Sequence, residues 1–569
     1  MPISFLAQVA SPLSIPLQYS GNFGEIRTGH FHTGMDIRTE GREGLAVLAA
    51  TDGEVSRVKV SVRGYGNALY LDSPSDSIDS PRFTTVYAHL SAFHPAIESW
   101  VMEQQYARKK WAVDVRPETN QQAILHFSAG DTIGWSGNSG GSFGPHLHFE
   151  VRDRASQHPL NPLAWGLADS DVVPPEFKAL WIIPVQAESE GVARRWTPEQ
   201  GDWLQVGGPV RLGVEALDRM DGTGFVHGLY GLDVFEALQD STGTEQLNLL
   251  YSHQMDELSF SSNKDVAAHT IYRAWMEKKS RIHRLHKLPG SRLRIYEKPA
   301  GLAPFDLAAG DSLKLKIQLR DHAGNATTVR LGLVGLMGVI SSLDSTALTP
   351  PVFDHQAPYG LGSDSAAVQA FFPGGCFYQD TWVELLTDSQ QFACEVRSGD
   401  AALRSSYKLS FDVPKDSLAE AADPAPWVLC RLLDAGGVGG AVTATWSADE
   451  MEGRVEFLVK AFGFFELRRD TTPPQFSSPK WEAETLRVFV ADDLSGIASH
   501  GGFSGGQWIR VSLDKGWLEY RLADRADDGR RARIWAVDKA GNYGELNVDW
   551  PSEDVPEDVP EISTKIKSD

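Results

Sequence analysis

The stretch from Gly137 to Arg152, GNSGGSFGPHLHFEVR, constrains this chain more than any other. Its second half alternates polar and apolar residues, which is typical of a β-strand, because a strand sends successive side chains to opposite faces. The polar residues His146, His148 and Glu150 therefore share one face. The apolar residues between them face a core, so the strand presents two imidazoles and a carboxylate on its other side.

Two imidazoles on one face suggest a metal site, because imidazole is a common ligand of zinc. A catalytic zinc usually takes three protein ligands and leaves a fourth position for water. The upstream segment GHFHTGMDI, expected to be a loop that approaches the sheet, supplies His32 and Asp36, and the segment FTTVYAHLS is predicted to be a strand that ends at His89. An H-x-H pair alone is more often a chance pairing of surface histidines, so the prediction depends on the three segments together.

These segments resemble the pattern of the LytM/lysostaphin-type zinc metalloendopeptidases, which is H-x-x-x-D, then Y-x-H, then G-P-H-x-H. The matching residues are His32 and Asp36, Tyr87 and His89, and Gly144 to His148. The resemblance covers roughly residues 20 to 165, and no core position of the pattern is missing. It implies that His32, Asp36 and His148 hold one Zn²⁺ per chain, while His89 and His146 are the catalytic pair that does not bind the metal.

The resemblance also implies a fold, an activity and a location. We expect a mainly β protein, in which a β-hairpin-rich peptidase domain of the duplicated hybrid motif type is followed by two or three β-sandwich modules. Zinc-bound water would attack peptide bonds in peptidoglycan stem peptides or crosslinks. The protein would work in the cell envelope, either periplasmic or secreted, and its β-sandwich modules would meet the wall or an envelope protein partner.

The residue types at the predicted site suit hydrolysis. Zinc can lower the pKa of a bound water from ~15.7 to about 7. The sequence has no H-E-x-x-H motif, so the helix-borne glutamate base of the thermolysin type is not available. His89 and His146 are natural substitutes, since imidazole titrates near neutral pH and can orient water or pass a proton.

Two later segments with the same opening and closing residues predict repeated modules. They are flanked by DVVPPEF (171–177) and DHAGN (321–325), and by DTTPPQF (470–476) and DKAGN (538–542). Paired prolines favour extended backbone, and A-G-N suits a tight turn between strands. We therefore predict a β-sandwich at 171–335, a further β-rich domain at 345–467 and an immunoglobulin-like domain at 470–550.

The remaining parts of the chain have weaker signals. Residues 1–20 are predicted to be a leader or the remnant of a signal peptide, residues 21–168 the peptidase domain, and the acidic residues 551–569 a disordered tail. The segment PAIESWVMEQQYARKKW has helical spacing, and we predict a helix there that forms one wall of the active-site groove.

Length, charge and cysteine content limit the other possibilities. At 569 residues the chain is too long for one hydrophobic core, and its net charge of −22 argues against nucleic acid as a partner. No run of 18 or more apolar residues occurs, so the chain is not predicted to span a membrane. Cys376, Cys394 and Cys430 all lie in one late region, which excludes a thiolate zinc site near the histidine motifs and leaves one disulfide at most.

Several neighbours of the motifs permit two interpretations. His30 could contact substrate or a ligand, and Arg27 could bind a substrate carboxylate or form a structural salt bridge. A salt bridge is also the commoner role for Glu150. Ile26 and Arg27 occur where some members that cut glycine bridges have a tyrosine, which favours a crosslink endopeptidase of a Gram-negative type.

Two other functions fit part of the pattern. A LytM-like scaffold or activator of a cell-wall amidase would resemble the family without cleaving peptide bonds, but such proteins lose ligands and this chain keeps all five positions. A phosphate-accepting histidine pair, as in sugar phosphotransferase carriers, would not need Asp36. An Asp36→Ala variant separates the cases, because only a metal enzyme would lose metal affinity.

Overall fold

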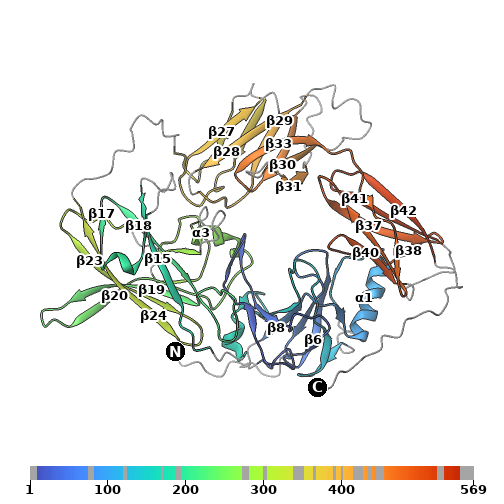
Figure 1. Ribbon diagram of the computed structural model, residues 1–569, viewed down its shortest axis with the longest axis horizontal. Coiled ribbons are helices and arrows are strands. Elements are labelled where there is room, and N and C mark those ends of the chain that lie inside the picture. Colours follow the sequence, from blue (N-terminus) through green and yellow to red (C-terminus); the bar gives the residue numbers. More distant parts are fainter. Residues whose placement is uncertain are drawn as a thin grey trace, which may run out of the picture. The chain divides into compact units, whose positions relative to one another are not determined.

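The computed structural model describes residues 9–74, 82–118, 125–167, 171–185, 194–271, 281–298, 304–336, 352–362, 367–388, 392–398, 401–413, 427–432, 438–443, 454–521 and 531–550. Over these residues the chain is mainly β, as predicted (Figure 1). It divides into two compact units, Met1–Gln104 with Ala112–Asp470, and Gln105–Trp111 with Thr471–Asp569. The start of the predicted leader, residues 1–8, and the predicted tail lie outside the described residues.

The first β region, residues 9–167, is built on a nine-stranded antiparallel sheet. Its path runs β1 (Tyr19–Gly21), β4 (Met35–Arg38), β13 (His146–Asp153), β8 (Phe83–Ala88), β7 (Ala68–Asp72), β6 (Gly53–Val60) and β10 (Val113–Val115). At its margins, β11 (His126–Phe127) pairs with β6 and β14 (Pro159–Leu160) pairs with β13. Smaller sheets are formed by β2 (Ile26–Arg27) with β3 (His30–Phe31), and by β5 (Ala46–Leu48), β12 (Thr132–Trp135) and β9 (Ala92–Phe93).

Strand β13 occupies an interior position in this sheet, between β4 and β8. The predicted alternation is present, because Leu147, Phe149 and Val151 are fully buried in the core. The other face of β13 is also covered, and Glu150 on that face is fully buried. A buried carboxylate needs partners, so the polar face of β13 is the place to look for chemistry.

The second β region, residues 171–336, contains two sheets that share one hydrophobic core. The four-stranded sheet contains β16 (Arg194–Trp196), β15 (Glu176–Pro184), β18 (Val210–Leu217) and β21 (Ile282–Arg284). The six-stranded sheet contains β17 (Trp203–Val206), β24 (Ala326–Gly335), β23 (Ser312–Arg320), β19 (Gly231–Gln239), β20 (Glu245–Gln254) and β22 (Tyr296–Lys298). The short helix α3 (Val266–His269) lies between β20 and β21 in the sequence.

The third β region, residues 352–470, is also a two-sheet structure around a shared core. One sheet contains β25 (Tyr359–Leu361), β26 (Val368–Phe372), β29 (Tyr407–Asp412) and β32 (Arg454–Val459). The other contains β27 (Val383–Asp388), β28 (Ala393–Ser398), β33 (Gly463–Arg469), β30 (Trp427–Leu432) and β31 (Val438–Thr443). The three cysteines lie in this region as buried free thiols.

The C-terminal β region, residues 471–550, has two further sheets. The first contains β34 (Gln475–Phe476), β36 (Thr485–Ala491), β40 (Trp517–Arg521) and β39 (Ser512–Asp514), with β35 (Lys480–Glu482) paired to β36. The second contains β38 (Gln507–Ile509), β37 (Ile497–Ser504), β41 (Arg531–Asp538) and β42 (Tyr543–Asp549). The predicted domain boundaries and the immunoglobulin-like assignment stay predictions.

The repeated A-G-N segments form the tight turns predicted from the sequence. Gly324 and Gly541 have φ values of 98° and 96°, which glycine adopts without strain. In the first turn, an Asp321 carboxylate oxygen accepts hydrogen bonds from the backbone N–H groups of Gly324 and Asn325 at 2.7 and 2.8 Å. In the second turn, an Asp538 carboxylate oxygen accepts from the backbone N–H of Asn542 at 2.9 Å, so an aspartate holds the backbone of both turns.

The helix predicted after His89 is α1 (Pro95–Arg108). Over the described ranges, no helix is long and apolar enough to cross a membrane.

Candidate metal centre

The pairing of β13 with both of its neighbours explains how distant motifs meet. His148 lies directly across from Asp36 on β4 and from Ala88 on β8. His89 follows Ala88, and its φ of 62° is a left-handed conformation that ends the strand and redirects the chain. Asp36 thus lies inside a strand, and the prediction that both upstream candidates are on a loop is wrong for this residue.

Three of the five predicted side chains meet closely enough to share one metal ion. His148 Nδ1 lies 2.8 Å from Asp36 Oδ1 and 3.0 Å from His32 Nε2, and His32 Nε2 lies 3.1 Å from the same Asp36 oxygen. All three residues are buried. Two imidazole nitrogens and one carboxylate oxygen are the donor set of a catalytic zinc with an open fourth position, so these residues fit the implied metal.

His89 and His146 lie beside this group, with ring centroids 4.7 Å apart. His146 Nε2 is 3.4 Å from Asp36 Oδ1. The Nδ1 atoms of His89 and His146 each donate to a backbone carbonyl at 2.8 Å, that of Ser139 and that of Gly144 respectively. Because a carbonyl can only accept, a neutral ring keeps Nε2 as its basic atom.

Hydrogen bonds from outside the group fix the orientation of both ligand imidazoles. His32 Nδ1 donates to the backbone carbonyl of Asn22 at 2.8 Å, which leaves Nε2 facing Asp36 and His148. His148 Nε2 lies 2.8 Å from Glu150 Oε1, which leaves Nδ1 facing Asp36 and His32. Such carboxylate and carbonyl partners set the tautomer of metal-binding histidines.

Glu150 therefore does more than the salt bridge expected for it. That salt bridge exists, since Arg152 Nε lies 2.5 Å from Glu150 Oε2. The other carboxylate oxygen contacts His148 and accepts from the hydroxyls of Thr33 and Tyr65 at 2.6 and 2.5 Å. The shared strand face of His148 and Glu150 was the sequence signal for this contact, whereas Thr33 and Tyr65 had none.

Arg27 takes the structural one of its two predicted roles. Its guanidinium lies 2.6 Å from Asp36 Oδ2 and 3.3 Å from Glu25. It thereby occupies the Asp36 oxygen that does not face the histidines. His30, the other uncertain neighbour, is exposed and lines the cavity described below.

The electrostatic environment gives the histidines of the site different pKa values. Burial lowers the pKa of His32 to about 4 and that of His89 to about 3, so both rings are neutral at pH 7. Burial also disfavours a charged His148, but hydrogen bonds with Asp36 and Glu150 raise its pKa to about 9. Burial would raise the pKa of Asp36, yet the neighbouring imidazoles hold it well below its usual range. A metal ion that binds His148 must displace a proton.

A cavity of about 1200 Å³ opens over this group. All five predicted site residues line it, and the second β region contributes Phe225, Phe260, Asn263, Lys264 and Arg281. Among the described residues that line it, none belongs to α1, so the prediction that this helix forms one wall of the active-site groove is wrong. The wall is formed instead by a region that the motif does not include.

Two asparagines join the second β region to the segment that carries His32. The Asn263 side chain accepts from Phe31 N at 2.8 Å and donates to Phe31 O at 3.0 Å. The Asn22 side chain makes the same reciprocal pair with Gly228, at 2.8 Å for each bond. Because Asn22 also holds the His32 ring, the second region helps to position a candidate ligand.

Comparisons with known proteins support the pattern read from the motifs. No family model matches the chain. It is 30% identical over 142 residues to the DD-carboxypeptidase/endopeptidase Mpg of Neisseria meningitidis serogroup B. The aligned residues cover 25% of this chain and 24% of that protein. It is also 30% identical over 164 residues to an uncharacterized metalloprotease of Haemophilus influenzae, covering 28% of this chain and 26% of that protein.

Among solved structures, the chain is similar to the catalytic domain of the M23 protein EnpA from Enterococcus faecalis, with 22% identity and a TM-score of 0.20 over 28% of this chain and 98% of that one. It is also similar to the catalytic domain of lysostaphin from Staphylococcus simulans, with 25% identity and a TM-score of 0.18 over 26% of this chain and 86% of that one. These similarities to peptidases extend over about a quarter of this chain. The chain spans about a quarter of the length of the curated relatives it matches.

Proposed function

We propose that this protein is a zinc-dependent metalloendopeptidase that hydrolyses peptide bonds in peptidoglycan stem peptides or crosslinks in the cell envelope. The observation that carries the proposal is the meeting of His32, Asp36 and His148 beside His89 and His146 in one cavity. These side chains come from separate segments of the chain. A pattern that is only a chance resemblance would not require them to meet.

Each of the five residues has a proposed role that follows from its contacts. His32 Nε2, Asp36 Oδ1 and His148 Nδ1 would hold the metal, which would supply Lewis-acid polarisation of the scissile carbonyl and a more acidic water. His146, whose Nδ1 is bound to a carbonyl, uses Nε2 to accept a proton from the attacking water and return it to the leaving amine. His89, whose pKa is lowered by burial to about 3, uses Nε2 to orient the water as a hydrogen-bond acceptor. Glu150 keeps His148 oriented throughout.

Basic residues along the cavity suit a peptide substrate that carries free carboxylates, as peptidoglycan stem peptides do. Arg27 and Arg281 both contact Glu25, so their charges are partly neutralised. Lys264 lines the same cavity from the second β region. We infer that Lys264 attracts a substrate carboxylate, and that the second β region therefore takes part in substrate binding.

Metal content and cleavage, measured on the same samples, test this function. The Asp36→Ala variant should lose zinc at the site and should fail to cleave purified crosslinked muropeptides. The His146→Ala variant should keep that zinc and lose cleavage, because His146 does not hold the metal. If the wild-type protein binds zinc at this site but leaves all muropeptides intact, a LytM-like scaffold or amidase activator replaces the enzyme.

A further inference from the structure

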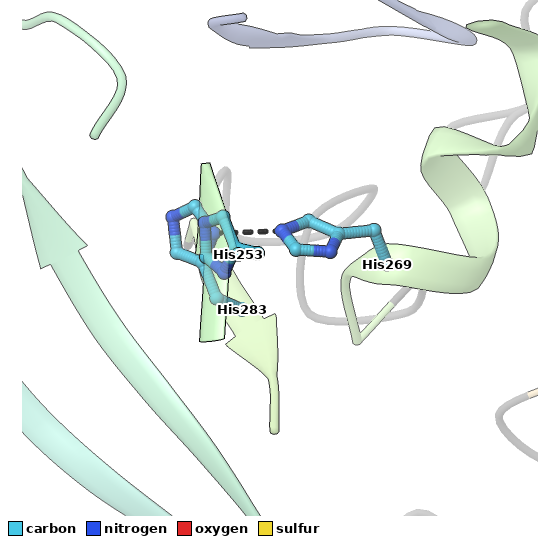
Figure 2. Close-up of side chains that lie close together, drawn as sticks. All are labelled: His253, His269 and His283. Carbon is cyan, nitrogen blue, oxygen red and sulfur yellow. Dashed lines mark hydrogen bonds between the residues drawn. The ribbon is translucent and has the colours of Figure 1, made fainter. Parts of the chain in front are cut away.

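A second group of histidines lies inside the second β region, away from the peptidase motifs. His253 is on β20, His269 ends α3 and His283 is on β21. Figure 2 shows His269 reaching from its helix toward the other two rings, which lie close together. One ring nitrogen of each lies within 4.8 Å of the others. Three separate segments therefore converge on one point, as they do at the first site.

The hydrogen bonds of these rings leave one nitrogen of each near the other two rings. His253 Nδ1 pairs with the hydroxyl of Tyr251 at 3.0 Å, and His269 Nδ1 pairs with the hydroxyl of Tyr296 at 3.1 Å. His269 Nε2 lies 2.9 Å from His283 Nδ1. His253 Nε2 is buried and makes no hydrogen bond to any described residue. A buried polar atom without a partner is unfavourable, and a metal ion would satisfy it.

The three rings are prepared for metal binding by their burial. The exposed fractions of His253, His269 and His283 are 0%, 0% and 2%. Burial lowers the pKa of His283 to about 3 and holds the pKa values of the other two well below the usual range. Neutral imidazole is the form that binds metals, so protons do not compete at neutral pH.

We propose that His253, His269 and His283 form a second metal site, which binds a divalent transition-metal ion such as Zn²⁺. Imidazole suits zinc, copper, iron and nickel, whereas magnesium and calcium prefer oxygen ligands. The site is enclosed, and none of its three residues is among those lining the large cavity. Its role is therefore structural.

A metal ion there would hold together the part of the second region that contacts the first site. His269 packs edge-on against Phe31, with ring centroids 5.5 Å apart. Asn263, just before α3, holds both backbone groups of Phe31. Phe31 directly precedes His32. The second site would thus stabilise the surface on which a ligand of the first site rests.

Counting zinc ions in the full-length protein tests this proposal separately from the peptidase activity. After equilibration with micromolar Zn²⁺ and removal of loose metal, the wild-type protein should hold two zinc ions per chain by elemental analysis. The His148→Ala variant should hold one. In that background, His269→Gln or His283→Gln should reduce the count to zero, whereas His286→Gln, at a buried histidine outside the group, should leave one.

A second measurement keeps the test decisive if the glutamine variants fold poorly. Zn²⁺ should raise the melting temperature of the otherwise unchanged His148→Ala protein, and Co²⁺ should give it a ligand-field absorption spectrum. A His148→Ala protein that folds normally but binds neither ion would overturn the second site. That result would leave the peptidase proposal untouched, since the first site is already removed in this variant.

Discussion

The two histidine groups of this protein use similar ligands in opposite surroundings. The first combines two imidazoles with the Asp36 carboxylate and borders a cavity of about 1200 Å³. The second has three imidazoles, is almost fully buried and is flanked by tyrosine hydroxyls. Access decides what each can do, because catalysis needs an open coordination position that substrate can reach. The comparison separates a site built for chemistry from one built for stability.

The same contrast appears in the protonation of the histidines. At the first site, carboxylates raise the pKa of His148 to about 9. At the second site burial acts without a neighbouring carboxylate and lowers the pKa of His283 to about 3. The first site must therefore release a proton when it binds metal, and the second need not.

The largest expected effect is the loss of catalysis without loss of metal. Replacing His146 with alanine should lower kcat/KM on crosslinked muropeptides by at least about 100-fold, because a general acid or base contributes that much. Zinc content should remain that of the wild-type protein. If the His146→Ala variant lost the zinc as well as the activity, His146 would be a metal ligand, which would contradict the proposed roles.

A smaller effect is expected at the outer partner of His148. Glu150→Gln keeps the size of the side chain but weakens the hydrogen bond to His148 Nε2. Zinc affinity at the first site should fall roughly 10- to 100-fold, as for other such partners of metal ligands. Competition with a chromogenic chelator measures this affinity.

The matched control for Glu150→Gln lies at the second site. Tyr251→Phe removes the hydroxyl that holds His253 Nδ1. It should lower zinc affinity at the first site less than Glu150→Gln does, because Tyr251 contacts a histidine of the second group and not a ligand of the first. Equal losses of first-site affinity in both variants would mean that Glu150 acts no more directly on the first site than Tyr251 does.

Chelation should affect stability through the second site. In the His148→Ala background, EDTA should lower the melting temperature by about 3 °C or more, since an ion that binds only the folded state stabilises it. Adding His283→Gln should remove this dependence on EDTA. Differential scanning fluorimetry at matched protein concentrations can measure both, and an EDTA effect that survives in the double variant would contradict the assignment.

The smallest effect is a pH dependence in the presence of EDTA. The pKa of His283 is about 3 in the folded protein, against an ordinary value of 6.5. The unfolded chain therefore binds more protons between these values, and stability falls as the pH drops from 6.5 toward 3. His283→Gln should show a shallower decline in melting temperature than the wild-type protein over pH 6.5 to 5. Parallel profiles would mean that His283 is not held neutral by burial.

The first histidine group could be predicted from the sequence, and the second could not. The first was predictable because its motifs are local: alternation placed His146, His148 and Glu150 on one face of β13, and the resemblance connected that strand to His32, Asp36 and His89. The mainly β fold is confirmed, while the catalytic and ligand roles stay predictions. The second group has no local spacing, since its residues belong to two strands and a helix that meet only through tertiary packing.

Two predictions from the sequence are wrong because both features depend on tertiary packing. The turn-rich residues around Asp36 favoured a loop, but this segment pairs with β13 and forms a strand. The helix after His89 was correctly located by its apolar spacing, yet spacing says nothing about which surface a helix covers. The cavity wall comes from residues more than 190 positions beyond His32, such as Phe225 and Phe260, and only the folded structure brings them there.

The proposed function requires these five side chains to hydrolyse a peptide bond. Mass spectrometry of defined crosslinked muropeptides, incubated with the zinc-loaded wild-type protein, tests it most directly. We expect products that together exceed the substrate by the mass of one water molecule, and no products with Asp36→Ala. Intact muropeptides after incubation with zinc-loaded wild-type protein, or equal cleavage by Asp36→Ala, would contradict it.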